Sequence, residues 1–254
     1  MGALTYQADD GVRVAYHDWN AGADGPPIVL QHGFTSCSVR NWLLTGIVEA
    51  LTRGGRRVIA IDARGHGESD KPRDPAFYGG LRLARDLSDV LGSLNVESYD
   101  LVGYSMGAMI AVHAAASDVR VRRLVLSGTG AYLLERAKAD GVFFSAEVAA
   151  ALEADDPACI TDPAGAFLRK VADASQGDRL ALAALARSLF ERLPVDAVRI
   201  PTLVLVGNAD PFAWGADRLV HAIAGARLEL VPGDHIWTLH NAQYATSLLG
   251  FLAV

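Results

Sequence analysis

Short apolar runs alternate with longer segments of helical pattern over residues 1–130 and 195–254. The clearest apolar runs predict β-strands at 28–31, 58–61, 100–102, 123–127, 202–206 and 228–231. Two earlier segments, 4–7 and 12–18, predict an antiparallel pair joined near Gly11. Strands that alternate with helical crossovers are typical of a largely parallel sheet, so we expect an α/β fold.

Helical spacing is clear at three places between and after these strands. Apolar residues recur on one helical face in the segment 83–94, namely Leu83, Leu87, Val90, Leu91 and Leu94. Residues 106–117 are apolar nearly all round, which predicts a buried helix. The last helix is expected to begin near Asn241, with His240 at its start.

Residues 131–194 depart from this alternation. The segment is rich in alanine and charge, and it contains no convincing strand. Leucines at 182, 185, 189 and 193 repeat on one helical face. We therefore predict a helical insertion that forms a small lid over the strand ends, where α/β folds bind ligands. The core would then comprise residues 1–130 and 195–254.

A nucleophile motif follows the predicted strand 100–102. The sequence Gly103-Tyr104-Ser105-Met106-Gly107 stands between that strand and the buried helix, and G-x-S-x-G in this context carries a nucleophilic serine on a sharp turn. Side chains at the two flanking positions would collide in so tight a turn, which explains the glycines. The helix N-terminus favours negative charge beside Ser105.

A serine nucleophile needs a base, and His235 is the best placed of the seven histidines. It alone occupies a loop at the carboxyl end of the last predicted strand, where it could meet Ser105. By contrast, His113 and His221 fall inside predicted helices, and His240 begins the last one. The sequence therefore predicts His235 as the general base.

An acid must orient that base, and it should also follow a strand. Asp210 comes directly after the strand 202–206, whereas Asp234 is adjacent to His235 and badly placed to accept from its ring. Asp217 is expected on a helix. We choose Asp210, which gives the chain order Ser, Asp, His.

Two backbone N–H groups are needed to hold a developing oxyanion. One should belong to Met106, the residue after the nucleophile. The other should come from the loop after the strand 28–31, where Phe34 is the candidate.

Taken together, the motifs resemble those of the α/β-hydrolase superfamily, in particular short-lid esterases and non-haem haloperoxidase-like members. They are His32-Gly33-Phe34, the run Asp62-Ala63-Arg64-Gly65-His66-Gly67-Glu68-Ser69-Asp70, the Ser105 motif, Asp210 and His235. The resemblance implies a mostly parallel eight-stranded sheet with helices on both faces and a small helical lid. Dehalogenases and epoxide hydrolases carry aspartate at the nucleophile position, so Ser105 argues against both activities.

Charge, apolar stretches and cysteine content limit the classes of partner, location and cofactor to be expected. The net charge is −6, with acidic and basic residues mixed along the chain, so neither nucleic acid nor an anionic membrane is indicated. The N-terminus lacks the pattern of a secretory signal, and the longest apolar stretch, 108–116, is too short to cross a bilayer. Cys37 and Cys159 have neither metal-ligand spacing nor a disulfide framework. We expect a cytoplasmic protein that acts on a small molecule without metal or organic cofactor, in an oligomeric state that the sequence leaves open.

The function expected from these residues is hydrolysis of a carboxylic ester, lactone or thioester through an acyl-enzyme on Ser105. Aromatic residues that could line the substrate pocket are Phe143, Phe144, Trp214 and Trp237. Two alternatives stay open: hydrolysis of a carbon–carbon bond, and a ligand-sensing regulator that retains the triad with little turnover.

Overall fold

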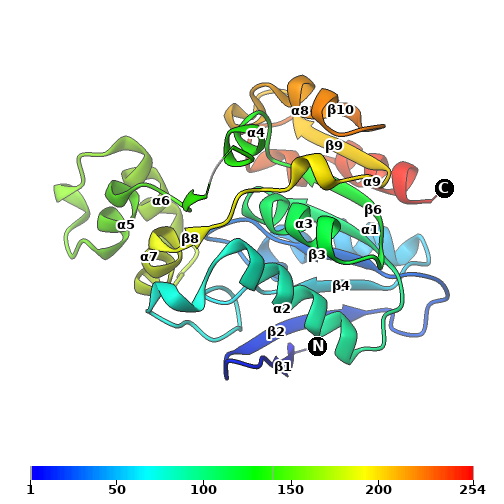
Figure 1. The fold of residues 1–254 in the computed structure, drawn as a ribbon, viewed down its shortest axis with the longest axis horizontal. Helices are drawn as coiled ribbons and strands as arrows, with labels where there is room; N and C mark the ends of the chain where they lie inside the picture. The colour runs from blue at the N-terminus through cyan, green and yellow to red at the C-terminus, as the bar shows by residue number, and fades with distance from the viewer. Residues whose placement is uncertain (1, 139, 254) are drawn as a thin grey trace.

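Eight β-strands form the central sheet of the computed structural model, which describes residues 2–138 and 140–253 (Figure 1). They are β1 (Leu4–Gln7), β2 (Arg13–Trp19), β3 (Ile28–Gln31), β4 (Val58–Ile61), β5 (Tyr99–Tyr104), β6 (Val121–Ser127), β9 (Thr202–Gly207) and β10 (Arg227–Val231). Their order across the sheet is β1-β2-β4-β3-β5-β6-β9-β10. Only β1–β2 and β2–β4 pair antiparallel within this sheet, so the predicted, mostly parallel sheet is confirmed.

Helices cover both faces because the central strands are buried on both sides. In β3, Val29 joins the apolar core on one face, whereas Ile28 and Leu30 join the core on the other. The helices on the first face are α2 (Gly80–Ser93), α3 (Met106–Ser117) and α8 (Ala216–Ala222). Those on the second face are α1 (Ile47–Arg53) and α9 (Ala242–Leu252). The buried helix predicted at 106–117 is α3.

The described residues of the segment 131–194 form four α-helices beside the sheet. They are α4 (Tyr132–Arg136), α5 (Ala146–Glu153), α6 (Pro163–Ala174) and α7 (Arg179–Arg187). Figure 1 shows α5, α6 and α7 gathered at one end of the molecule, whereas α4 lies near α8. The helical character predicted for this segment is therefore present.

Two details predicted for that segment are wrong. It does contain strands, since β7 (Gly141–Val142) and β8 (Leu189–Phe190) form a short antiparallel pair. The leucine row is also not one helical face, because α7 ends at Arg187 and Leu189 is exposed in β8. Burial of Phe190 against Phe143, with ring centroids 4.7 Å apart, accounts for the extended backbone that replaces the predicted helix.

Short helical turns complete the fold. They are η1 (Val39–Leu43), η2 (Pro75–Phe77), η3 (Pro157–Cys159), η4 (Val195–Ala197), η5 (Pro211–Ala213) and η6 (Trp237–His240). The last of these corrects the sequence prediction for His240, which ends η6 instead of beginning α9. The side chain of Asn241 caps α9 by accepting from the Gln243 N–H, and this cap separates the two elements. In the part of the chain that the structure describes, no helix has the length and apolar character needed to span a bilayer.

A buried arginine, Arg64, connects α2 to the segments around the end of β4 by hydrogen bonds. The Arg64 side chain has 0% exposure and donates to both carboxylate oxygens of Asp86, at 2.6 and 2.8 Å. It also donates to Asp10 at 2.6 Å and to the Phe77 carbonyl at 2.8 Å. Charged hydrogen bonds of this kind, removed from water, fix the geometry of the segments that they join.

We expect Arg64→Met to lower the free energy of unfolding by on the order of 3 kcal/mol, because the buried Asp86 then keeps only Arg82 on Oδ1 and its Oδ2 loses its partner. Arg13→Met is the matched control. Arg13 pairs with Asp70, but the two side chains are 53% and 39% exposed, so its loss should cost less than about 1 kcal/mol. Urea denaturation of both variants measures the difference, and equal losses would contradict this account of Arg64.

Candidate active site

Ser105 occupies a strained turn between β5 and α3. Its backbone has φ 54° and ψ −113°, a conformation that residues other than glycine rarely adopt. A Cβ at Gly103 would lie 2.3 Å from the Gly107 carbonyl oxygen, and a Cβ at Gly107 would lie 2.1 Å from the Gln31 carbonyl oxygen. The two glycines are therefore required by close backbone contacts, which agrees with the crowding expected from the motif.

His235 lies between Ser105 and Asp210. Its Nε2 is 3.2 Å from Ser105 Oγ, and its Nδ1 is 2.9 and 3.1 Å from the two carboxylate oxygens of Asp210. Because a carboxylate only accepts, Nδ1 carries a proton, and in the neutral ring Nε2 remains an acceptor for the serine hydroxyl. The structure thus brings together the three residues that the sequence predicts as nucleophile, base and acid.

Asp210 and Asp234 differ in what their carboxylates contact. The Asp210 side chain is fully buried and also accepts from the Phe212 N–H at 2.8 Å. Asp234 is exposed and accepts from the N–H groups of Trp237 and Ile236, at 2.8 and 2.9 Å. These backbone hydrogen bonds lower the pKa of Asp234. Asp234 therefore shapes the turn that carries His235, while Asp210 contacts the imidazole ring.

The loop after β3 lies against Ser105. A Cβ on Gly33 would be 3.3 Å from the Cβ of Ser105. The Gly33 N–H is bound to Asn41 Oδ1 at 2.9 Å, whereas the N–H of Phe34 has no acceptor among residues 2–138 and 140–253. Met106 is the first residue of α3, where backbone N–H groups have no acceptor within the helix. Both predicted oxyanion donors therefore stand on elements that flank Ser105.

Three further contacts at this site were not predicted. The Tyr104 hydroxyl donates to the His235 carbonyl oxygen at 2.6 Å. The ring centroids of Phe212 and His235 lie 4.5 Å apart. Asn41 Oδ1 accepts from the Gly33 N–H. Burial raises the pKa of Tyr104 well above its usual value, so its hydroxyl stays a donor. Tyr104 stands inside the nucleophile motif, but the local pattern carries no sign of a partner 131 residues away.

The four aromatic residues predicted for the pocket fall into two groups. Phe143 and Phe144 pack on Phe34, with ring centroids 5.5 and 5.0 Å from it, so they adjoin the loop after β3, residues 32–35, which is called the oxyanion loop below after its predicted role. Trp214 and Trp237 are 68% and 64% exposed, on the loops that carry Asp210 and His235. Phe143 lies in the apolar core and the half-buried Phe144 packs against it, whereas Trp214 and Trp237 lie on the surface.

Related proteins cover this chain to different extents. The chain is 28% identical to a non-heme haloperoxidase from Rhodococcus erythropolis, over 96% of this chain and 97% of that protein. It is 37% identical to a 2-hydroxymuconate semialdehyde hydrolase from a Pseudomonas species, over 47% of this chain and 41% of that protein. Matches to two further curated relatives cover 45% and 27% of their lengths, so the chain spans less than half of several relatives that it matches.

A solved structure and a family model cover most of the chain. The enol-lactonase from Burkholderia xenovorans shares the fold, with a TM-score of 0.78 and 23% identity over 99% of this chain and 100% of that one. Residues 26–213 match the family model described as the alpha/beta hydrolase fold. Since this match spans well over half of the sequence and the sheet has the corresponding topology, the chain belongs to the α/β-hydrolase family.

Proposed function

We propose that this protein is a serine hydrolase that cleaves a carboxylic ester, lactone or thioester through an acyl-enzyme on Ser105. The observation that carries the proposal is the continuous relay from Asp210 through His235 to Ser105, with ring-nitrogen distances of 2.9 and 3.2 Å. A buried carboxylate, a partly exposed imidazole and a hydroxyl in this order are the groups that nucleophilic acyl transfer requires.

In the first half of the proposed reaction, His235 Nε2 takes the proton of Ser105 as Oγ attacks the carbonyl carbon. The N–H groups of Phe34 and Met106 hold the resulting oxyanion, and Asp210 stabilises the imidazolium. When the tetrahedral intermediate collapses, the bond to the leaving group breaks, and His235 returns the proton to that group. The acyl chain stays on Ser105.

In the second half, His235 takes a proton from water, and the resulting hydroxide equivalent attacks the acyl carbon. Collapse releases the carboxylic acid and returns the proton to Ser105 Oγ. The half-buried position of Ser105 and the exposed edge of His235, which is 22% exposed, leave a route for that water.

We further propose that residues 131–194 act as a lid on a core of residues 1–130 and 195–254, and that the substrate is a small molecule. Phe143 and Phe144 reach the oxyanion loop from the segment 131–194 and would line the acyl pocket. Trp214 and Trp237 would contact the more exposed part of the substrate, because they lie on the loops of the acid and the base.

Hydrolysis of a carbon–carbon bond is the second candidate. The relative named 2-hydroxymuconate semialdehyde hydrolase has a substrate without an ester group, although the match covers only 47% of this chain. A ligand-sensing regulator is the remaining alternative. It would trap an acyl product or gain thermal stability with ligand but show negligible steady-state turnover.

We expect Ser105→Ala to reduce hydrolysis of short p-nitrophenyl esters by at least about 1,000-fold, because alanine lacks the hydroxyl on which the acyl-enzyme is proposed to form. Ser117→Ala, at the far end of α3, is the control and should keep its rate. Steady-state absorbance assays measure both. Equal rates for wild type and Ser105→Ala would refute the assignment of the nucleophile.

We expect Asp210→Asn to lower kcat by about 1,000- to 10,000-fold, because the amide can donate to Nδ1 and stabilise the wrong imidazole tautomer. Asp234→Asn is the matched control: its amide oxygen can still accept from the turn N–H groups, so kcat should change less than about 3-fold. The assay is the same ester hydrolysis, with circular dichroism to check folding. If the two variants lost similar amounts of activity, Asp210 would not be the orienting acid.

A further inference from the structure

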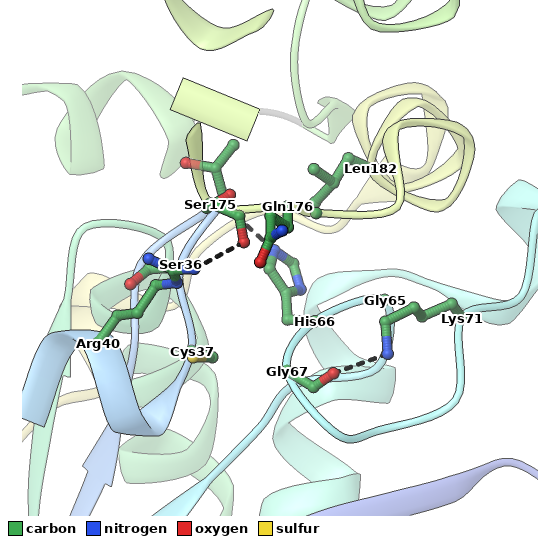
Figure 2. A pocket seen from close by; sticks show the side chains of 12 residues that line it. Ser36, Cys37, Arg40, Gly65, His66, Gly67, Lys71, Ser175, Gln176 and Leu182 are labelled. Atoms are coloured by element: carbon green, nitrogen blue, oxygen red, sulfur yellow. Dashed lines mark hydrogen bonds between the residues drawn. The ribbon is translucent and has the colours of Figure 1, made fainter. Parts of the chain in front are cut away.

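Besides His235, a buried histidine, His66, contacts the oxyanion loop at Phe34 and Thr35. It is 3% exposed, and its ring centroid lies 5.7 Å from that of Phe34 and 5.1 Å from that of His32. His66 lines a cavity of about 80 Å³. Figure 2 shows Arg40 to one side of His66 and Lys71 to the other. The catalytic steps proposed above do not use this ring.

The partners of His66 determine its protonation state. Its Nε2 faces the Thr35 backbone N–H at 3.3 Å, and its Nδ1 faces the Arg64 carbonyl oxygen at 3.2 Å. A backbone N–H can only donate and a carbonyl can only accept, so the ring must be neutral with its proton on Nδ1. His32 is arranged in the same way, between the Gly33 carbonyl at 2.8 Å and the Ala63 N–H at 3.0 Å.

The N–H groups on both sides of Phe34 are therefore anchored. The Gly33 N–H is bound to Asn41 Oδ1 and the Thr35 N–H to His66 Nε2, whereas the Phe34 N–H has no acceptor in the described chain. Thr35 also has φ 62°, a left-handed conformation that a β-branched residue adopts only when its surroundings impose it. The hydrogen bond to His66 supplies such a constraint.

We propose that neutral His66 is a positioning residue of the oxyanion hole, whose Nε2 holds the Thr35 N–H and thereby keeps the Phe34 N–H directed at the reacting carbonyl. This inference rests on the proposed acyl-transfer function. Protonation of His66 would turn Nε2 into a donor that faces another donor. The loop would then lose its anchor, and with it the geometry of the oxyanion hole.

The surroundings of His66 favour the neutral ring. Burial lowers the pKa of His66 to about 3, and the neighbouring His32 and Lys71 add to the decrease. The hydrogen bond to the Arg64 carbonyl and the charge of Asp62 oppose it. Arg40 lies on the same cavity, which no carboxylate lines. Since the folded pKa is depressed, the anchor is intact at neutral pH and is lost as pH falls toward that value. The unfolded chain takes up the proton earlier, so acid also favours unfolding.

The test compares His66→Phe with His66→Gln. Phenylalanine keeps an aromatic ring beside Phe34 but accepts no hydrogen bond, so we expect kcat for p-nitrophenyl acetate to fall about 10- to 100-fold with KM changed less than about 2-fold. Glutamine can accept from the Thr35 N–H, so kcat should stay within about 3-fold of wild type. His113→Gln, at another buried histidine with a lowered pKa, should retain its kcat.

Two further measurements separate positioning from a general loss of fold. An alkyl boronic acid forms a tetrahedral adduct on the serine, so its inhibition constant should rise for His66→Phe in parallel with the fall in kcat/KM. Nitrogen-15 NMR of the wild-type ring should show the neutral Nδ1–H tautomer from pH 8 down to at least about pH 5. A cationic ring or an Nε2–H tautomer in that range would overturn the proposal, as would an unchanged kcat in His66→Phe. Failure of the proposed function appears differently, because wild type itself would not hydrolyse the ester while the NMR result would still stand.

Discussion

The close contact between α3 and the end of β3 is the constraint on which the site depends. A single Cβ at Gly107 would lie 2.1 Å from the Gln31 carbonyl oxygen, so the first turn of α3 and the loop after β3 share one small volume. This contact sets Ser105 beside Gly33, where a Cβ would be 3.3 Å from that of the serine. The strained φ of Ser105 is held because the backbone has no room to relax.

Parallel pairing then brings the other groups to the same edge. In the sheet, β5 and β9 flank β6, and β10 lies next to β9. Ser105 follows β5, Asp210 follows β9 and His235 follows β10, so all three lie at the same edge of the sheet. Their side chains meet although 130 residues separate serine from histidine. The Tyr104 hydroxyl adds a hydrogen bond from the turn that carries Ser105 to the His235 carbonyl oxygen, so the proposed base is held through both its ring and its main chain.

Sequence patterns were informative where the determining interaction is local. Two-sided burial of β3 and β5 gives continuous apolar runs, and the crowding at Gly103 and Gly107 appears in five adjacent residues, so the sheet and the nucleophile turn could both be predicted. The prediction that the leucines at 182, 185, 189 and 193 share one helical face is wrong at Leu189. There the backbone is extended because Phe190 packs on Phe143 in the core, and the spacing of apolar residues cannot reveal such a contact between distant positions. Asn41 and Phe212 were missed for the same reason, since their roles depend on folded neighbours.

The histidines show why residue type alone could not settle the chemistry. His235 faces a carboxylate at Nδ1 and a hydroxyl at Nε2, so a proton arriving at Nε2 creates a cation beside Asp210, where it is stabilised. His66 faces a backbone N–H at Nε2, and the same proton would create a repulsive pair inside a buried site. In the proposed reaction, the His235 ring can therefore exchange protons with a substrate, whereas the His66 ring can only hold the backbone. The partners on the two ring nitrogens, which are a property of the fold, assign these roles.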